Sequence, residues 1–106
     1  MDPKFYSFLG LAMRAGKVVS GEEQVLGAIR NRKACLVIVA TDASENTMKK
    51  VTEKARYYRI PCIAVGDRYK LGQAIGKGER VLLAVTDRGF AKGLMRYEGV
   101  TYLGVD

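Results

Sequence analysis

The chain has 106 residues, the length of one ordinary domain and too short for two full hydrophobic cores. Hydrophobic residues make up 48% of it, a normal share for a globular protein, so disorder is not expected. Lys and Arg number 18 against 11 Asp and Glu, a net charge of +7 that favours a polyanionic partner, nucleic acid before an anionic membrane. A basic surface that serves only solubility is the alternative interpretation.

The sequence carries no targeting or membrane-spanning signature. Its N-terminus has no apolar core long enough for secretion, and its longest apolar runs have the length of strands. We therefore expect a cytoplasmic protein that spans no membrane. Cys35 and Cys62 form no CxxC pair and the chain has no histidine, so zinc and thioredoxin-like sites fit poorly. Both cysteines are expected to be buried, reduced thiols.

The chain begins with a predicted helix that Asp2 caps and Gly16 ends, followed by a short strand at 17–19. Residues 20–23 (Ser-Gly-Glu-Glu) are typical of a capping box. In such a box the serine hydroxyl accepts from the amide of the second glutamate, and that glutamate reaches back. A second helix is predicted from this point to about Asn31.

The middle of the chain is predicted to run strand, helix, strand. The β-branched run 36–40 is typical of a strand that is covered on both faces. Ser44 can cap a third helix, in which Met48, Val51, Ala55 and Tyr58 recur at helical spacing. Residues 60–65 form the next predicted strand, with its proline near the start, where a missing donor is tolerated.

The C-terminal third continues the alternation of predicted helices and strands. Asp67 caps a short fourth helix that runs through Ile75, and 81–86 is another buried strand. Asp87 caps a fifth helix, and 100–103 is a terminal strand.

This alternation predicts the fold class. Strands that alternate with helices indicate a mostly parallel or mixed sheet of four to five strands between two layers of helices. We therefore predict a three-layer α/β/α sandwich that forms one domain over residues 1–106.

No motif in the chain predicts catalysis. Histidine, the commonest general base near neutral pH, is absent. Asp42 and Asp87 follow strands, as acids of α/β enzymes often do, but each also fits a loop or a helix cap. The glycine-rich stretches 72–78 and 10–17 lack the spacing of a phosphate-binding loop, and no GxGxxG follows a strand. We therefore expect no catalytic residue, metal ligand or cofactor.

The remaining signal is a set of backbone amides and basic side chains at loop ends. The helix start at residues 20–21 offers unpaired amides and a positive dipole end, which suit a phosphate or a base edge. The flexible loop 76–78 (Gly-Lys-Gly) can bring its backbone close to a ligand. Basic side chains near these turns are expected to converge with them at one edge of the sandwich: Arg14, Lys17, Arg30, Arg32, Lys33, Lys77, Arg80 and Arg88. For any single one of these basic side chains, the alternative interpretation is a solvated charge that contacts no ligand.

The order of several short motifs resembles a known family. They are Gly21-x-x-x-Val25-x-x-Ala28-Ile29, Leu36-Val37-Ile38-Val39-Ala40-x-Asp42, Ile60-Pro61, Leu71-Gly72-x-Ala74-x-Gly76 and Ala84-Val85-x-Asp87-x-Gly89. In this order and spacing they resemble the kink-turn RNA-binding ribosomal proteins, relatives of the large-subunit proteins L7Ae and L30e. The stretches 9–21 and 86–91 resemble the bacterial YlxQ group, and the likeness covers roughly 5–94.

The resemblance implies an α/β/α sandwich that docks a kinked RNA duplex. The second helix start would meet sheared G·A pairs, and the loop after Leu71-Gly72 would cover an extruded nucleotide. The family's RNA-reading stretch, Gly-x-Asn-Glu-x-x-Lys, falls on residues 21–27. Gly21 matches and Gln24 still offers hydrogen bonds, whereas Glu23 replaces the asparagine and Gly27 replaces the phosphate-binding lysine. The predicted RNA-binding residues are Lys17, Gly21, Glu23, Gln24, Gly27, Arg30, Ile75, Gly76, Lys77 and Gly78.

We therefore predict a monomeric, ribosome-associated protein that binds structured RNA, either ribosomal or another non-coding RNA, and contacts other components of a ribonucleoprotein. A protein–protein adaptor that keeps the fold after losing RNA specificity is the first alternative, favoured by Glu23 and Gly27. An enzyme or small-ligand carrier is the second, and it would need a deep pocket around Asp42 or Asp87.

Overall fold

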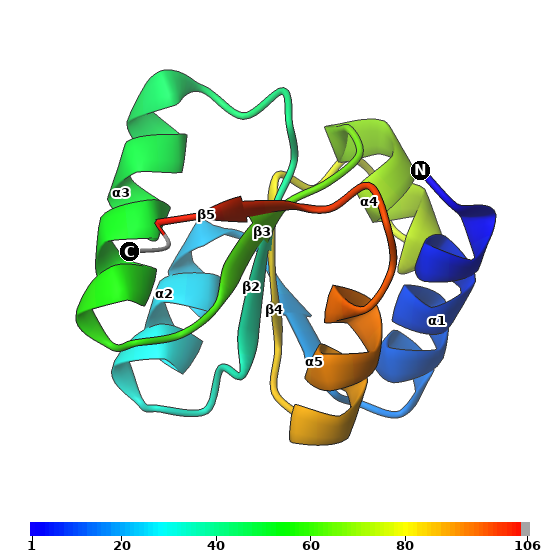
Figure 1. Cartoon of the computed structure of the whole chain (residues 1–106), viewed down its shortest axis with the longest axis horizontal. Helices are drawn as coiled ribbons and strands as arrows, with labels where there is room; N and C mark the ends of the chain where they lie inside the picture. The colour runs from blue at the N-terminus through cyan, green and yellow to red at the C-terminus, as the bar shows by residue number, and fades with distance from the viewer. Residues whose placement is uncertain (105–106) are drawn as a thin grey trace.

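A computed structural model describes residues 1–104, which form a five-stranded sheet with helices on both faces (Figure 1). In chain order the elements are α1 (Pro3–Arg14), β1 (Val18–Ser20), α2 (Glu22–Arg30), β2 (Leu36–Val39), α3 (Glu45–Tyr57), β3 (Cys62–Ala64), α4 (Arg68–Ala74), β4 (Leu82–Val85), α5 (Arg88–Met95) and β5 (Thr101–Leu103). The predicted three-layer α/β/α sandwich is confirmed. Within residues 1–104, no helix combines the length and the apolar character that a bilayer crossing requires.

The sheet is mixed, with strand order β1-β4-β2-β3-β5. The pair β2–β3 is parallel, whereas β4 runs antiparallel to both of its neighbours, β1 and β2. The mostly parallel alternative is therefore wrong. The reason is that β4 inserts between β1 and β2, which run in the same direction, and pairs with both in reverse.

The central strands separate two apolar layers. All four residues of β2 and of β4 are buried, as the β-branched pattern predicts for strands covered on both faces. Leu36, Ile38 and Leu83 face one side and pack against α1, α4 and α5. Val37 and Val39 face the other side and pack against α2 and α3.

Most of the predicted helix caps are confirmed. The side chains of Asp2, Ser44, Asp67 and Asp87 each accept a backbone amide in the first turn of their helix. The capping box at Ser20 is wrong, because β1 extends one residue beyond its predicted end and includes Ser20. Gly21 is the N-cap of α2, without a side-chain cap, and the Ser20 hydroxyl accepts from Arg80 Nε at 3.2 Å instead.

The two cysteines differ in exposure, and neither forms a disulfide. Cys62 lies in β3 and is 2% exposed, and this burial raises the pKa of its thiol to about 11. Cys35 is half-buried, so the prediction of two buried thiols is wrong for this residue. It lies in the turn between α2 and β2, just outside the four buried residues of that strand.

The first prediction concerns Gly72, where α4 packs against the chain that follows it. A Cβ on Gly72 would collide with the carbonyl oxygen of Gly78. Gly72→Ala should therefore lower the free energy of unfolding by about 1–3 kcal/mol in urea denaturation. Gly27→Ala is the control, because its Cβ would meet open space in the interior of α2 and should add about 0.5–1 kcal/mol. Equal destabilisation of both variants would contradict the described packing.

Candidate nucleic-acid interface

The antiparallel pairing of β1 and β4 joins two distant segments at one end of the sheet. The Gly21 amide donates to the Leu82 carbonyl at 3.0 Å, so the start of α2 lies beside the chain that enters β4. A groove of about 600 Å³ opens between them, here called the α2-start groove. Its lining consists of Met13, Val18, Val19, Ser20, Gly21, Gln24, Lys77, Glu79, Arg80 and Val81.

The start of α2 supplies backbone donors to this groove. Gly21 has φ +93° and ψ 152°, a conformation that L side chains rarely adopt, and it turns the chain directly from strand to helix. The first helical bond runs from the Val25 amide to the Gly21 carbonyl, so the amides of residues 22–24 have no partner within the helix. These amides and the positive end of the helix dipole suit a phosphate or a base edge.

Acidic side chains flank the same helix start. Glu22 pairs with Lys50 of α3 at 3.3 Å, which offsets part of its charge. Glu23 is exposed in the first turn of α2. The α2-start groove therefore combines amide donors with an adjacent carboxylate.

Arg80 spans the groove from the side of β4. Its Nε donates to the Ser20 hydroxyl at 3.2 Å and its Nη1 donates to the Glu79 carbonyl at 2.8 Å. These bonds hold the half-buried guanidinium against the end of β1. Arg80 is one of the predicted basic side chains but not one of the predicted RNA contacts. Arg80 directly precedes the predicted strand 81–86, and this position is the signal that could have added Arg80 to the predicted RNA contacts.

The loop 76–80 is anchored at its base by α4. The Lys77 amide donates to the Gly72 carbonyl at 2.9 Å, and the Gly76 amide donates to the Gln73 carbonyl at 3.1 Å. Residues 76–78 are nevertheless exposed. The backbone of the loop is thus fixed in place while the Lys77 side chain projects from the surface.

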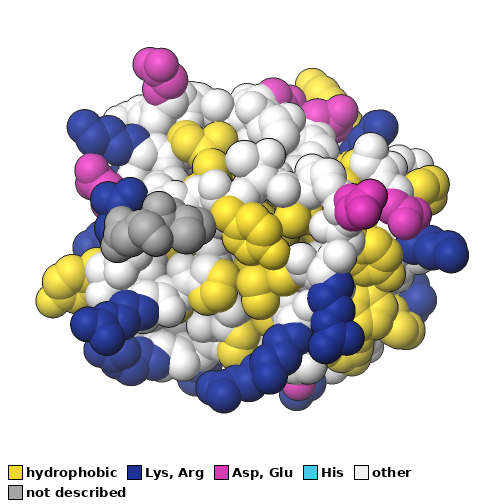
Figure 2. Space-filling model, in the orientation of Figure 1, with side chains coloured by type: hydrophobic (Ala, Val, Ile, Leu, Met, Phe, Trp, Pro, Cys, Tyr) yellow, Lys and Arg dark blue, Asp and Glu magenta, His cyan; other side chains and the backbone are white. Residues whose placement is uncertain are grey.

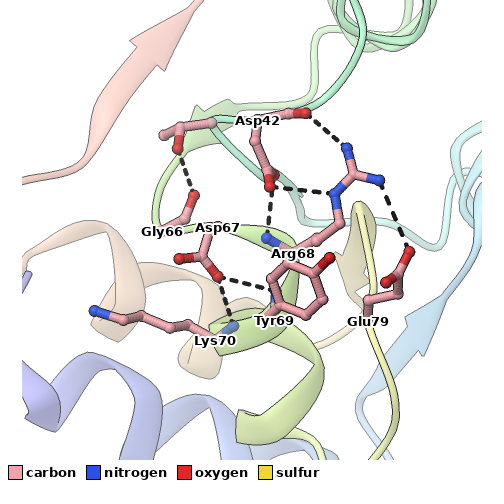
Figure 3. A network of polar contacts seen from close by, with 8 residues as sticks. Asp42, Gly66, Asp67, Arg68, Tyr69, Lys70 and Glu79 are labelled. Atoms are coloured by element: carbon pink, nitrogen blue, oxygen red, sulfur yellow. Dashed lines mark hydrogen bonds and ion pairs between the residues drawn. The ribbon is translucent and has the colours of Figure 1, made fainter.

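Arg68 ties this loop to the end of β2 (Figure 3). Its backbone amide and Nε donate to the two carboxylate oxygens of Asp42, both at 3.1 Å, and its Nη2 donates to the Asp42 carbonyl at 2.8 Å. Its Nη1 lies 3.8 Å from Glu79 Oε1, and its carbonyl accepts from the Arg80 amide at 3.0 Å. Asp42 therefore acts as a structural partner of Arg68 in this loop.

The structure brings together part of the predicted contact set. Gly21, Gln24 and Lys77 line the α2-start groove, and Glu23, Gly76 and Gly78 are neighbours of these three in the chain. Ile75 is 6% exposed and packs in the core with α1 and α4, so its side chain is not available to a ligand.

The other predicted contacts lie away from the groove. The Lys17 carbonyl accepts from the Thr86 amide, which places Lys17 beyond the opposite end of β1. Gly27 is in the middle of α2, and Arg30 is its last residue. Because α2 returns antiparallel to β1, Arg30 is also directed to that opposite end.

The prediction that the basic side chains converge at one edge is therefore wrong. Lys77 and Arg80 line the α2-start groove, whereas Arg32 and Arg88 line a different groove at the far end of β4. The physical reason is that β4 is extended, so the loops before and after it lie at opposite ends of the sheet, and its antiparallel pairing with β1 places only the first of these loops beside the start of α2.

Comparison with known proteins identifies the family. The model of the ribosomal protein L7Ae/L30e/S12e/Gadd45 family matches residues 3–95. The chain belongs to this family. The resemblance predicted from the motif order is thereby confirmed.

Individual L7Ae/L30e/S12e/Gadd45 relatives cover most of the chain. "RNA-binding protein YlxQ" of Bacillus subtilis (strain 168) is 53% identical over 92 residues, which are 87% of this chain and 92% of the relative. "RNA-binding protein YlxQ" of Enterococcus faecium is 49% identical over 89 residues, 84% of this chain and 85% of the relative. A solved structure, described as a protein with unknown function from Bacillus halodurans C, superposes with a TM-score of 0.86 at 47% identity. That comparison covers 89% of this chain and 95% of the other.

The second prediction tests how Arg68 holds the α2-start groove. Asp42→Ala should lower the free energy of unfolding by about 1 kcal/mol, because a half-exposed ion pair with several hydrogen bonds is lost. The exchange of the Arg68 amide with solvent should also accelerate, since this amide loses its acceptor. Glu53→Ala removes an exposed acid from α3 and is the control. Unchanged Arg68 exchange in Asp42→Ala would contradict the network of Figure 3.

Proposed function

We propose that the chain is an RNA-binding protein that recognises structured, kink-turn-like RNA at the α2-start groove and catalyses no reaction. The whole chain acts as one RNA-binding domain in a cytoplasmic, ribosome-associated complex. The observation that carries the proposal is the convergence of the uncapped α2 start with Lys77 and Arg80 in one groove. Membership of a ribosomal protein family and relatives named as RNA-binding proteins support it.

Each part of the groove has a distinct role in this proposal. The free amides of residues 22–24 contact a phosphate or the base edges of non-standard pairs. Gln24 carries a side-chain amide, which both donates and accepts and can therefore read a base edge. Lys77 and Arg80 contact backbone phosphates and release counterions. The exposed Gly76 and Gly78 let the loop approach an extruded nucleotide closely.

Glu23 weakens this recognition relative to the family pattern. Its carboxylate lies in the first turn of α2, beside the amides that would contact RNA. Glu23 is exposed, so its charge lies on the surface that RNA would approach. A carboxylate near phosphates is repulsive, so the chain is expected to bind with lower affinity than a relative with asparagine at this position.

The third prediction tests the groove with a double variant, Gln24→Ala combined with Lys77→Gln. Its affinity for a kink-turn RNA hairpin, measured by fluorescence anisotropy, should fall about tenfold. The slope of log K against log salt should become shallower by about 0.7–0.9, as expected for one lost phosphate contact.

Lys4→Gln is the matched control, because it removes one exposed charge from α1. A double variant that binds as tightly as the Lys4→Gln protein would refute this groove as the binding site. If the unaltered chain failed to prefer the hairpin over one with Watson–Crick pairs in place of the G·A pairs, kink-turn recognition would be refuted. The adaptor function would then be favoured.

The fourth prediction is a gain of affinity. Glu23→Asn removes a negative charge beside the bound phosphates and restores amide donors, so it should raise the affinity for the same hairpin about fivefold. Glu53→Gln removes one acid from α3 and should change the affinity little. Weaker binding by Glu23→Asn would mean that the carboxylate itself makes a favourable contact with the RNA.

A further inference from the structure

A second groove, here called the basic groove, lies at the opposite end of the sheet. It has a volume of about 450 Å³ and is lined by Arg32, Ala34, Cys35, Tyr58, Arg59, Ile60, Pro61, Arg88, Ala91, Lys92 and Met95. Four of these side chains are cationic, and none of the lining residues is acidic. The others are mainly apolar and form the floor.

Three separate turns of the chain build this groove. The turns from α2 to β2 and from α3 to β3 contribute one arginine each, and the start of α5 contributes Arg88 and Lys92. Leu36, at the start of β2, pairs with Val85, at the end of β4, so these turns share one end of the sheet. The length of β4, four residues or about 13 Å, separates this end from the α2-start groove.

Two cations of the basic groove, Arg32 and Arg59, occupy backbone conformations that favour glycine. Arg32 and Arg59 have φ of 57° and 58°, and among residues 1–104 they are the non-glycine residues with positive φ. Each follows the last turn of a helix, where glycine is the usual residue. The guanidinium of Arg32 also lies 5.2 Å from the centre of the Tyr58 ring, which holds it at the groove.

Helix dipoles account for three of the four cations and leave Arg88 unexplained. A cation after the end of α2 or of α3 is favourable, because that end of a helix is negative. Arg88, however, is the first residue of α5, at the positive end of its dipole, whereas Lys92 lies in the last turn, where a cation is favourable. The positive end of the α5 dipole and the neighbouring arginines disfavour the charge of Arg88, so an external anion is the partner that would compensate it.

The distribution of acidic residues between the two grooves points the same way. Glu79 lines the α2-start groove and Glu22 and Glu23 lie in the first turn of α2 beside it, whereas the basic groove has no acidic lining residue. Figure 2 shows Lys and Arg side chains gathered along the lower edge of the molecule, where α3 ends and α5 begins in Figure 1. The groove that is lined by four cations and no acid is therefore remote from the groove that the family resemblance selects.

We propose that the basic groove binds the backbone phosphates of a second RNA segment, so that the protein contacts RNA at both ends of its sheet. Four cations beside a helix start that Asp87 caps, with no side-chain amide in the lining, suit phosphates and do not read base edges. Binding at this groove is therefore independent of sequence and of any kink. It does not depend on kink-turn recognition at the α2-start groove.

Cys35 provides a direct probe of occupancy, because it lines the basic groove and is half-buried. The full chain is treated with iodoacetamide, an uncharged reagent, with and without a regular RNA duplex of about 20 base pairs. Alkylation is followed by mass spectrometry. We expect saturating duplex to slow alkylation of Cys35 at least fivefold, while Cys62, at 2% exposure, stays unreactive throughout. An unchanged rate at Cys35 would overturn the proposal.

A triple variant, Arg59→Asn with Arg88→Gln and Lys92→Gln, should abolish this protection. It should also reduce the salt slope of duplex binding by about 2 to 3. Asparagine tolerates positive φ, and a thermal melt checks that the variant is folded. The matched control removes three exposed cations that line neither of the two grooves, Lys4→Gln, Lys49→Gln and Lys70→Gln, and should retain protection.

Two further arms separate this proposal from its alternatives. Gln24→Ala with Lys77→Gln should keep the Cys35 protection, because these residues belong to the α2-start groove. Loss of protection in that variant would mean that a single RNA site covers both ends, which overturns an independent second site. Protection by polyglutamate but not by the duplex would overturn RNA as the ligand and assign the groove to an acidic protein segment.

Discussion

The antiparallel pairing of β1 with β4 determines where each functional group of this protein lies. Through it, the Gly21 amide reaches the Leu82 carbonyl at 3.0 Å, and Arg80 reaches the hydroxyl of Ser20. Residues separated by some sixty positions in the chain thereby form one groove. Without this pairing, the start of α2 and the loop 76–80 would be unrelated surface features.

The same strand direction also separates the charges. The loop before β4 carries Lys77 and Arg80, and the turn after it carries Arg88. Because the extended strand β4 separates the loop from the turn, the cations of the loop and those of the turn lie at opposite ends of the sheet. One end combines free amides with acids and cations, which suits a specific contact. The other end is cationic without an acid in its groove, which suits a general attraction to phosphates.

The sequence predicts the layered fold and the helix caps of this protein well, because both depend on residues close together in the chain. Asp67 needs only the amides that follow it, and the run 36–40 shows its burial in its own composition. Ser20 could not be assigned in this way, since its place in β1 depends on pairing with Leu83. The position of Lys17 relative to Gly21 likewise depends on strand direction, and the burial of Ile75 depends on packing against α1. The order of the motifs indicates the family from the sequence alone. The basic groove has no sequence motif, because it forms only where three separate turns of the chain come together in the fold.

Solution NMR of the nitrogen-15-labelled chain, titrated with a kink-turn RNA hairpin at moderate salt, tests the position of the specific site most directly. If RNA docks where β1 ends and β4 begins, the largest amide shift changes will fall at residues 21–24 and 76–80, with Gly21 and Lys77 among them. A complex that forms while these amides keep their free positions would contradict that placement.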